Sequence, residues 1–185
     1  MGKGFNKLVA QLGGEKIAAI ENSNTEFPIY KVNYKDTEIA FYMSDMGSVG
    51  AGGALEEIYA MGVETVIAYG SCGVLDGKIE DCAIIIPNAA VRDEGMSYHY
   101  APPSDEMAVN QKYISKFTEL LENEGSSYTF GKVWTTDAFY RETKTKVERR
   151  RAAGCICVDM ECSAMAAVAQ FRKKIFFTFS RQKII

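Results

Sequence analysis

The stretch Gly62-Val-Glu-Thr-Val-Ile-Ala-Tyr-Gly-Ser-Cys-Gly-Val-Leu75 decides the fold of this chain. Residues 63–69 are mostly apolar and do not alternate strictly, which is typical of a strand covered on both faces. Gly70 and Gly73 then predict a tight turn in which the backbone can approach a ligand, and Ser71 adds a hydroxyl to the main-chain donors. Open α/β sheets bind ligands at such turns, so an anion site is predicted here, although a plain turn explains a lone Gly-x-x-Gly equally well.

The composition is that of an ordinary globular protein. Of the 185 residues, 47% are hydrophobic and 24% are charged, so we expect one compact domain over residues 1–185. The net charge of −3 argues against a nucleic-acid-binding protein, because phosphate contacts require an excess of Lys and Arg. The apolar runs are far shorter than the roughly 18 residues of a membrane span, and no signal-peptide pattern opens the chain. These features predict a cytoplasmic protein with no membrane partner.

The cysteine pattern indicates a reducing compartment. The number of cysteines is odd, and none forms a Cys-x-x-Cys pair or lies near His99, the one histidine of the chain. We therefore expect free thiols, no zinc or other metal, and no cofactor. The five cysteines are Cys72, Cys82, Cys155, Cys157 and Cys162.

Apolar strand runs alternate with helical stripes along the chain, which predicts a single α/β domain with a mixed central β-sheet flanked by helices. The strand over residues 65–69 is expected inside this sheet. Lys35-Asp36 predicts a hairpin turn between two N-terminal strands, and residues 89–92 continue the strand before them or form the next one. The expected helices are 5–12, 54–61, one from 113 that ends near Gly125, 144–153 and 162–171. The other expected strands are 16–20, 28–34, 37–43, 82–87, 128–135, 155–158 and 174–179.

Three less regular stretches each allow two interpretations. The Gly-rich residues 45–53 form a flexible connection or an anion site at a helix start. The long loop over residues 93–105 carries His99, which is a general base or a histidine hydrogen-bonded in a loop or at a subunit contact. The charged run over residues 144–153 is a solvated helix face or a phosphate-binding element.

Several segments of the chain resemble one enzyme family. They are Val66-Ile-Ala-Tyr-Gly-Ser-Cys-Gly73, Val91-Arg-Asp-Glu-Gly-Met-Ser-Tyr-His-Tyr-Ala-Pro-Pro103, Thr135-Thr-Asp-Ala-Phe-Tyr140 and Val158-Asp-Met-Glu-Cys-Ser-Ala164. The last is similar to the signature Val-Glu-Met-Glu-x-x-Ala of the nucleoside phosphorylase family of the purine nucleoside and uridine phosphorylase type. This family also includes methylthioadenosine/adenosylhomocysteine nucleosidases. The resemblance covers roughly residues 28–172 and implies the family's fold.

The resemblance also implies a site for a nucleoside, with inorganic phosphate as co-substrate. Ser71 and Gly47 would bind phosphate. The ribose would contact Glu161, Met160 and Met46, with the Glu161 carboxylate accepting hydrogen bonds from the sugar hydroxyls. The base would stack on Phe139 and contact Cys72, Gly73 and Val158.

The chain departs from the family pattern at three places. The family has an arginine at the position of Ala68, and its N-terminal Gly-Asp-Pro-x-x-Arg phosphate loop is not found. No acidic residue follows Glu161, so the leaving-group acid and the final helix of the family are missing, as after a truncation or a frame change. The basic tail 180–185 could instead supply Arg181 as a replacement phosphate ligand.

The resemblance predicts a uridine-phosphorylase-like enzyme that cleaves the N-glycosidic bond of a nucleoside, with impaired activity because of these departures. A non-catalytic nucleoside-binding or oligomerising homologue and a nucleosidase are the alternatives. The family also implies a homo-oligomer, either a dimer or a hexamer. Without a final helix, we expect exposed apolar surface around Phe176, Phe177 and Phe179.

Overall fold

The computed structural model describes residues 3–22, 25–79 and 83–182 of the chain. They form two compact units, residues 1–45 and residues 46–185. The single domain expected from the composition stays a prediction. Among the described residues, no helix is long and apolar enough to cross a membrane.

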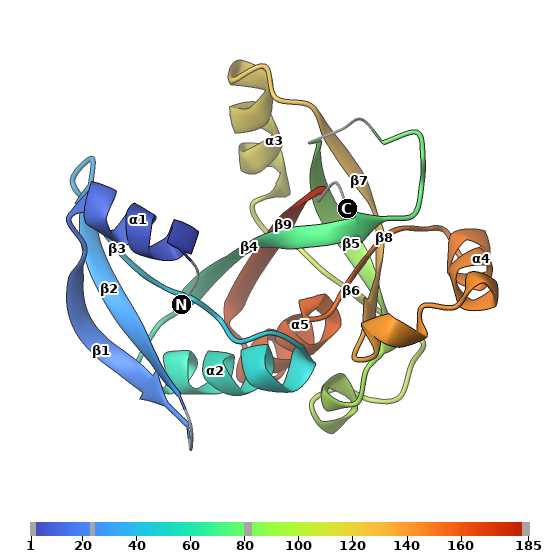
Figure 1. Ribbon diagram of the computed structural model, residues 1–185, viewed down its shortest axis with the longest axis horizontal. Helices are drawn as coiled ribbons and strands as arrows, with labels where there is room; N and C mark the ends of the chain where they lie inside the picture. The colour runs from blue at the N-terminus through green and yellow to red at the C-terminus, as the bar shows by residue number, and fades with distance from the viewer. Residues whose placement is uncertain (1–2, 23–24, 80–82, 183–185) are drawn as a thin grey trace. The chain divides into compact units, whose positions relative to one another are not determined.

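The first unit is a three-stranded antiparallel sheet with one helix (Figure 1). Helix α1 (Lys3–Leu12) is followed by strands β1 (Glu15–Glu21), β2 (Glu26–Tyr34) and β3 (Thr37–Tyr42). The predicted hairpin turn is confirmed, because Lys35 and Asp36 both have positive φ between β2 and β3, as the tightest hairpin turns require. The rings of Phe5, Tyr30 and Phe41 pack on one another, which explains why the helical stripe of α1 is apolar.

The second unit is built on a six-stranded mixed sheet in the order β6-β5-β7-β8-β4-β9 (Figure 1). Strand β9 also pairs with β5, so five of the strands close into a ring. Strand β4 pairs in parallel with β9 and antiparallel with β8, which confirms the expected mixed sheet. The expected interior position of residues 65–69 is wrong, because these residues pair only with β9 and β8 pairs only with Gly73 and Val74. The strands are β4 (Thr65–Val74), β5 (Ile84–Asp93), β6 (Glu106–Ala108), β7 (Tyr128–Thr136), β8 (Cys155–Asp159) and β9 (Ile175–Gln182).

Helices cover both faces of this sheet. Helices α2 (Ser48–Ala60) and α5 (Cys162–Arg172) pack side by side on one face. On the other face, α3 (Ile114–Asn123) covers β5 and β9, and α4 (Lys144–Ala152) covers β7 and β8. Two 3₁₀ turns, η1 (Met96–His99) and η2 (Phe139–Arg141), follow β5 and β7. The α/β class with flanking helices, predicted from sequence, is therefore confirmed.

The coverage of strand β4 differs from the prediction. Ile67 is 64% exposed and Tyr69 is 63% exposed, so only one face of the strand is buried within this chain. The expected apolar surface around Phe176 and Phe177 is also wrong, since both are buried and Phe179 packs against Phe117 of α3. An apolar run indicates that a strand packs against other elements, but it does not indicate which elements these are.

Both predicted Gly-rich turns prove to be parts of regular elements. Residues 70–73 continue β4 in extended conformation, and there the strand changes partner from β9 to β8. Gly73 permits this change, because a Cβ atom on it would lie 3.0 Å from Val158 Cγ1. Helix α2 starts at Ser48, six residues before the predicted start at Ala54, and a Cβ on its Gly52 would overlap the side chain of Met96.

Other element boundaries moved by only a few residues. Strand β5 starts at Ile84 and runs through residues 89–92 with an irregularity after Pro87. The predicted start of this strand at Cys82, and the end of the basic tail at residues 183–185, lie outside the described residues. The loop 93–105 contains η1, and His99 is exposed there.

Candidate functional site

The turn that carries Glu161 joins β8 to α5 and is clamped to the start of α2. Glu161 Oε1 accepts a hydrogen bond of 2.7 Å from the backbone N–H of Gly47, and Oε2 accepts one of 3.3 Å from Met160 N–H. Ser48 Oγ donates to the carbonyl of Met160 at 2.7 Å. Gly47 has φ 88° and ψ 161°, which is a conformation nearly restricted to glycine. These hydrogen bonds therefore hold the Glu161 carboxylate in one orientation at this turn.

Three residues predicted to contact the base lie next to this turn. Gly73 of β4 pairs directly with Val158 of β8, one strand position before Asp159. Cys72 is buried in the same core cluster as Cys157. Val158 packs with Leu75 and Trp134 on the opposite face of the sheet. Cys72, Gly73 and Val158 are thus neighbours where β4 pairs with β8, but the side chains of Cys72 and Val158 lie on opposite faces of the sheet.

Ser71 is exposed on β4, and its neighbour on β9 is Arg181. Residues paired across parallel strands direct their side chains to the same face of a sheet, so a hydroxyl and a guanidinium share this part of the surface. Strand β9 extends through Gln182, which places Arg181 in regular structure and not in the free tail expected from sequence. Ser71 and Arg181 can together contact an anion.

Phe139 and Met46 are placed by other contacts. Phe139 starts η2, is 40% exposed, and packs on the ring of Tyr140 with centroids 4.1 Å apart. Met46 immediately precedes Gly47 and is 67% exposed. Both present apolar side chains that a ligand could cover.

Asp159 precedes the start of α5 and is bonded on both carboxylate oxygens. Its Oδ1 accepts from Thr135 Oγ1 at 2.8 Å, and its Oδ2 accepts from Cys162 N–H at 3.0 Å, which is a favourable contact with the start of the helix. Desolvation of the carboxyl raises the pKa of Asp159 to about 7, although the hydrogen bond from Thr135 lowers it. Asp159 can therefore change charge near neutral pH.

Asp93 organises the charged run of α4. Its Oδ2 accepts from Trp134 Nε1 at 2.9 Å and from Lys146 Nζ at 3.2 Å, and lies 3.3 Å from a guanidinium nitrogen of Arg150. Burial opposes ionisation, but the hydrogen bonds from Trp134 and Lys146 lower the pKa of Asp93 overall. The expectation of a fully solvated face is therefore wrong for Arg150, whose side chain is largely buried, while phosphate binding by this run stays a prediction.

The surroundings of two buried cysteines, Cys157 and Cys162, raise the pKa of their thiols and so disfavour the thiolate. A hydrogen bond with Cys72 and burial raise the pKa of Cys157 well above its usual value, and burial does the same for Cys162. All cysteines in the described part of the chain are free thiols, and Cys82 lies outside it. The described residues also include no group of three or more His, Cys, Asp or Glu side chains that could hold a metal.

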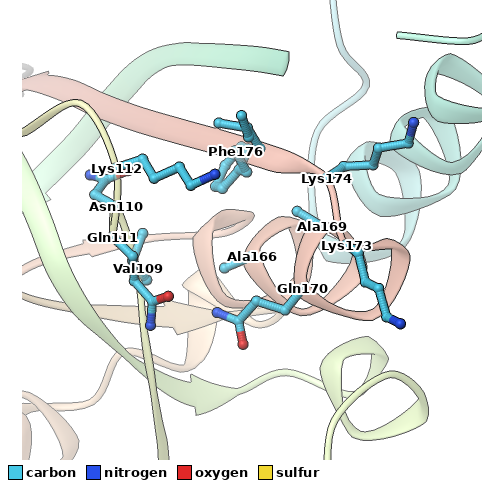
Figure 2. A pocket seen from close by; sticks show the side chains of 11 residues that line it. Val109, Asn110, Gln111, Lys112, Ala166, Ala169, Gln170, Lys173, Lys174 and Phe176 are labelled. Atoms are coloured by element: carbon cyan, nitrogen blue, oxygen red, sulfur yellow. The ribbon is translucent and has the colours of Figure 1, made fainter. Parts of the chain in front are cut away.

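A cavity of about 120 Å³ lies elsewhere in the second unit, at the end of α5 and the start of β9 (Figure 2). In Figure 2 the amines of Lys173 and Lys174 point in different directions, and Lys174 forms an ion pair with Glu64. None of the residues predicted to bind nucleoside or phosphate lines this cavity. Its lining is Val109, Asn110, Gln111, Lys112, Ala166, Ala169, Gln170, Lys173, Lys174, Ile175 and Phe176.

Comparison with known proteins gives the family of this chain. The family model described as Phosphorylase superfamily matches residues 1–180. The chain is 25% identical over 147 residues to guanosine phosphorylase of Halorubrum lacusprofundi, covering 80% of this chain and 61% of that protein. It is 31% identical over 115 residues to uridine phosphorylase of Thermococcus kodakarensis, covering 62% of this chain and 42% of that protein.

Solved structures agree with this family. A crystal structure of uridine phosphorylase from Vibrio fischeri ES114 superposes with a TM-score of 0.87 and 27% identity, covering 97% of this chain and 74% of that one. An AMP nucleosidase from Bacteroides thetaiotaomicron shares the fold at 21% identity with a TM-score of 0.82. The chain spans about 40 to 60% of the length of the two sequence relatives named above. The chain belongs to the phosphorylase superfamily.

Proposed function

We propose that this protein binds a nucleoside and inorganic phosphate at the Glu161 turn and cleaves the N-glycosidic bond by phosphorolysis, slowly, in the manner of a uridine phosphorylase. The observation that carries the proposal is the Glu161 carboxylate, which Gly47 N–H and Met160 N–H hold in place beside Val158 and Gly73. Membership of the phosphorylase superfamily supports it. No nucleic-acid partner is expected, and a cytoplasmic location likewise stays a prediction.

In this reaction a phosphate oxygen forms a bond to the anomeric carbon while the carbon–nitrogen bond to the base breaks. The base leaves with the bonding electron pair, and the ribose passes through a state with cationic character. Glu161 would accept hydrogen bonds from the 2′- and 3′-hydroxyls, which fixes the sugar and places negative charge near the developing cation. Met160 and Met46 would contact the sugar with their apolar side chains.

Ser71 would bind the phosphate together with Arg181, which is the partner of Ser71 in the pairing of β4 with β9. The guanidinium of Arg181 would supply positive charge on the face of β4 that carries Ser71, which is opposite the core face that carries Ala68. Gly47 was expected to bind phosphate as well, but its N–H is bonded to Glu161 in the ligand-free protein, so that role would require this bond to break. The base would stack on Phe139 and contact Cys72, Gly73 and Val158.

Slow turnover follows from the residue at position 68. The Ala68 side chain packs against the core formed by α2, α5 and the sheet, and it has no charge to offer a phosphate. Loss of one positioned charged group typically costs on the order of 10²-fold or more in rate. The same observation favours a second candidate function, a nucleoside-binding homologue that does not turn its ligand over, because ground-state binding does not need such groups.

We also propose that the protein is a homo-oligomer, a dimer or a hexamer. The exposed side chains of Ile67 and Tyr69 on β4 support this, since adjacent large apolar side chains on a sheet face are usually covered. Light scattering at micromolar concentration tests it, and a monomer alone would contradict it.

The experiment that tests the proposed function is release of free base from a panel of purine and pyrimidine nucleosides, with and without phosphate. Phosphorolysis predicts base release that requires phosphate and falls at least tenfold in Glu161→Gln, while Glu148→Gln on the exposed face of α4 stays at the wild-type rate. Equal release without phosphate would indicate a nucleosidase. Binding of nucleoside without any release would favour the non-catalytic candidate.

A further inference from the structure

A continuous chain of buried hydrogen bonds runs from strand β5 to the turn that carries Glu161, and we name it the Arg92–Asp159 relay. Its members come from β5, η1 and its preceding loop, β7, β8 and the first turn of α5. They are Arg92, Ser97, Glu94, Ser163, Thr135 and Asp159. All but Asp159 are less than a tenth exposed.

At one end, Arg92 holds the loop over residues 94–104. Its Nε donates to Ser97 Oγ at 2.8 Å. One terminal nitrogen donates to the carbonyl of Pro102 at 2.7 Å and to Ser104 Oγ at 2.8 Å. The guanidinium also stacks on the ring of Tyr98 at 4.1 Å. One buried cation therefore fixes the path of this loop.

In the middle, Glu94 joins the loop to α5. Its Oε2 accepts from Ser97 N–H at 2.9 Å, and its Oε1 accepts from Ser163 Oγ at 2.8 Å. Both carboxylate oxygens are thus satisfied by groups from different elements. Because an unsatisfied buried carboxylate is costly, the loop and the start of α5 must keep this relative geometry.

At the other end, the relay reaches both sides of Glu161. The N–H of Ser163 donates to Thr135 Oγ1 at 3.1 Å, and this hydroxyl donates to Asp159 Oδ1 at 2.8 Å. Asp159 and Ser163 are each two residues from Glu161, one before it and one after it. The single hydroxyl of Thr135 therefore ties together the two ends of the turn.

We propose that Thr135 and Ser163 are positioning residues for ribose recognition. They hold the 159–163 turn so that the Glu161 carboxylate is preorganised, and through Glu94 they make its position depend on the order of loop 94–104. This inference rests on the proposed function of Glu161 as the group that binds the ribose hydroxyls.

The test uses the ratio of two affinities, measured by calorimetry for uridine and guanosine and for their 2′,3′-dideoxy counterparts. Wild type should prefer the hydroxylated ligands, and Thr135→Val and Ser163→Ala should each reduce that preference roughly tenfold, as expected for the loss of one hydrogen bond to a charged group. Thr135→Ser retains the hydroxyl and should restore the preference. Thr118→Val and Ser115→Ala on α3 are matched controls. A variant whose affinity falls equally for the hydroxylated and the dideoxy ligands has only lost stability. That outcome would overturn the proposal.

A second readout does not depend on nucleoside binding. The amide of Gly47 donates to Glu161, so its hydrogen exchange in the ligand-free protein reports how well the carboxylate is held. Exchange at Gly47 should become roughly tenfold faster in Ser163→Ala and Thr135→Val but not at Val32 in β2. Unchanged exchange at Gly47 would overturn the relay. If the Gly47 amide exchanges faster in the two variants but wild type shows no preference for ribose hydroxyls, only the proposed role of Glu161 is overturned.

Discussion

Replacement of Asp159 by asparagine should remove most of the pH dependence that this residue gives to stability. Its carboxyl has a pKa of about 7 in the folded protein, against an ordinary value of 3.8. Between these two values the unfolded chain has lost the proton and the folded chain still holds it, so unfolding releases a proton. Stability therefore falls as pH rises, by about 1.4 kcal/mol per pH unit.

The whole effect amounts to about 4 kcal/mol between pH 4 and pH 8. Asparagine can keep the local geometry, because its carbonyl can accept from Cys162 N–H and its amide can donate to Thr135 Oγ1. At pH 4 the variant and wild type should thus be about equally stable. At pH 8 the variant should be more stable, since it carries no desolvated charge.

Urea unfolding at several pH values measures this difference. Trp134 is the only tryptophan of the chain and is fully buried, so its fluorescence reports unfolding of the second unit. The difference in free energy of unfolding between Asp159→Asn and wild type isolates the contribution of Asp159, because the other titrating groups are common to both proteins. A constant difference in the free energy of unfolding from pH 4 to pH 8 would show that Asp159 does not contribute this pH dependence, as would a wild type that gains stability relative to the variant as pH rises.

Three further predictions concern the same unit. Arg181→Gln should weaken phosphate binding roughly tenfold, because a charge-assisted contact is lost beside Ser71. Calorimetry with inorganic phosphate checks this, with Lys116→Gln on α3 as control, and unchanged affinity would exclude Arg181 as a phosphate ligand. Gly47→Ala should lower the free energy of unfolding by roughly 1–3 kcal/mol, because alanine is strained at φ 88°; a variant as stable as wild type in urea would be inconsistent with this backbone geometry. Asn110→Ala should cost about 3 kcal/mol, because the buried Asn110 side chain bonds Pro87 and both backbone groups of Thr178; a loss below about 1 kcal/mol in urea would contradict those bonds.

Local signals in the sequence were sufficient for much of the fold. The hairpin at Lys35-Asp36 was predictable because a polar pair that contains an aspartate, which tolerates positive φ, separates two strand runs. Cys155 and Cys157 of β8 are both buried, but they belong to different core clusters, because the register with β7 shifts between them. Glycine was ambiguous, since Gly73 and Gly52 serve close packing against Val158 and Met96 and do not form turns. The prediction of turns there failed for that reason.

The candidate site was predictable only in part. The residues of the Glu161 turn were found through resemblance to a family signature, and the structure adds what holds them. Gly47 and Glu161 are 114 residues apart, and Glu94 and Ser163 are 69 apart. Hydrogen bonds between such distant residues leave no periodic pattern in the sequence. Arg181 was suggested as a replacement phosphate ligand from the charge of the tail, but its pairing with Ser71 in β9 could not be predicted from sequence.

The most direct test of the account is nucleoside binding to wild type and to Glu161→Gln, measured by calorimetry with a panel of purine and pyrimidine nucleosides. Glutamine retains the size of the side chain but removes the negative charge that strengthens the hydrogen bonds from the ribose hydroxyls. Wild type should bind at least one nucleoside, and Glu161→Gln should bind it at least tenfold more weakly, while Glu148→Gln should bind it as wild type does. Equal affinity in wild type and Glu161→Gln, or no nucleoside bound by wild type, would contradict the account.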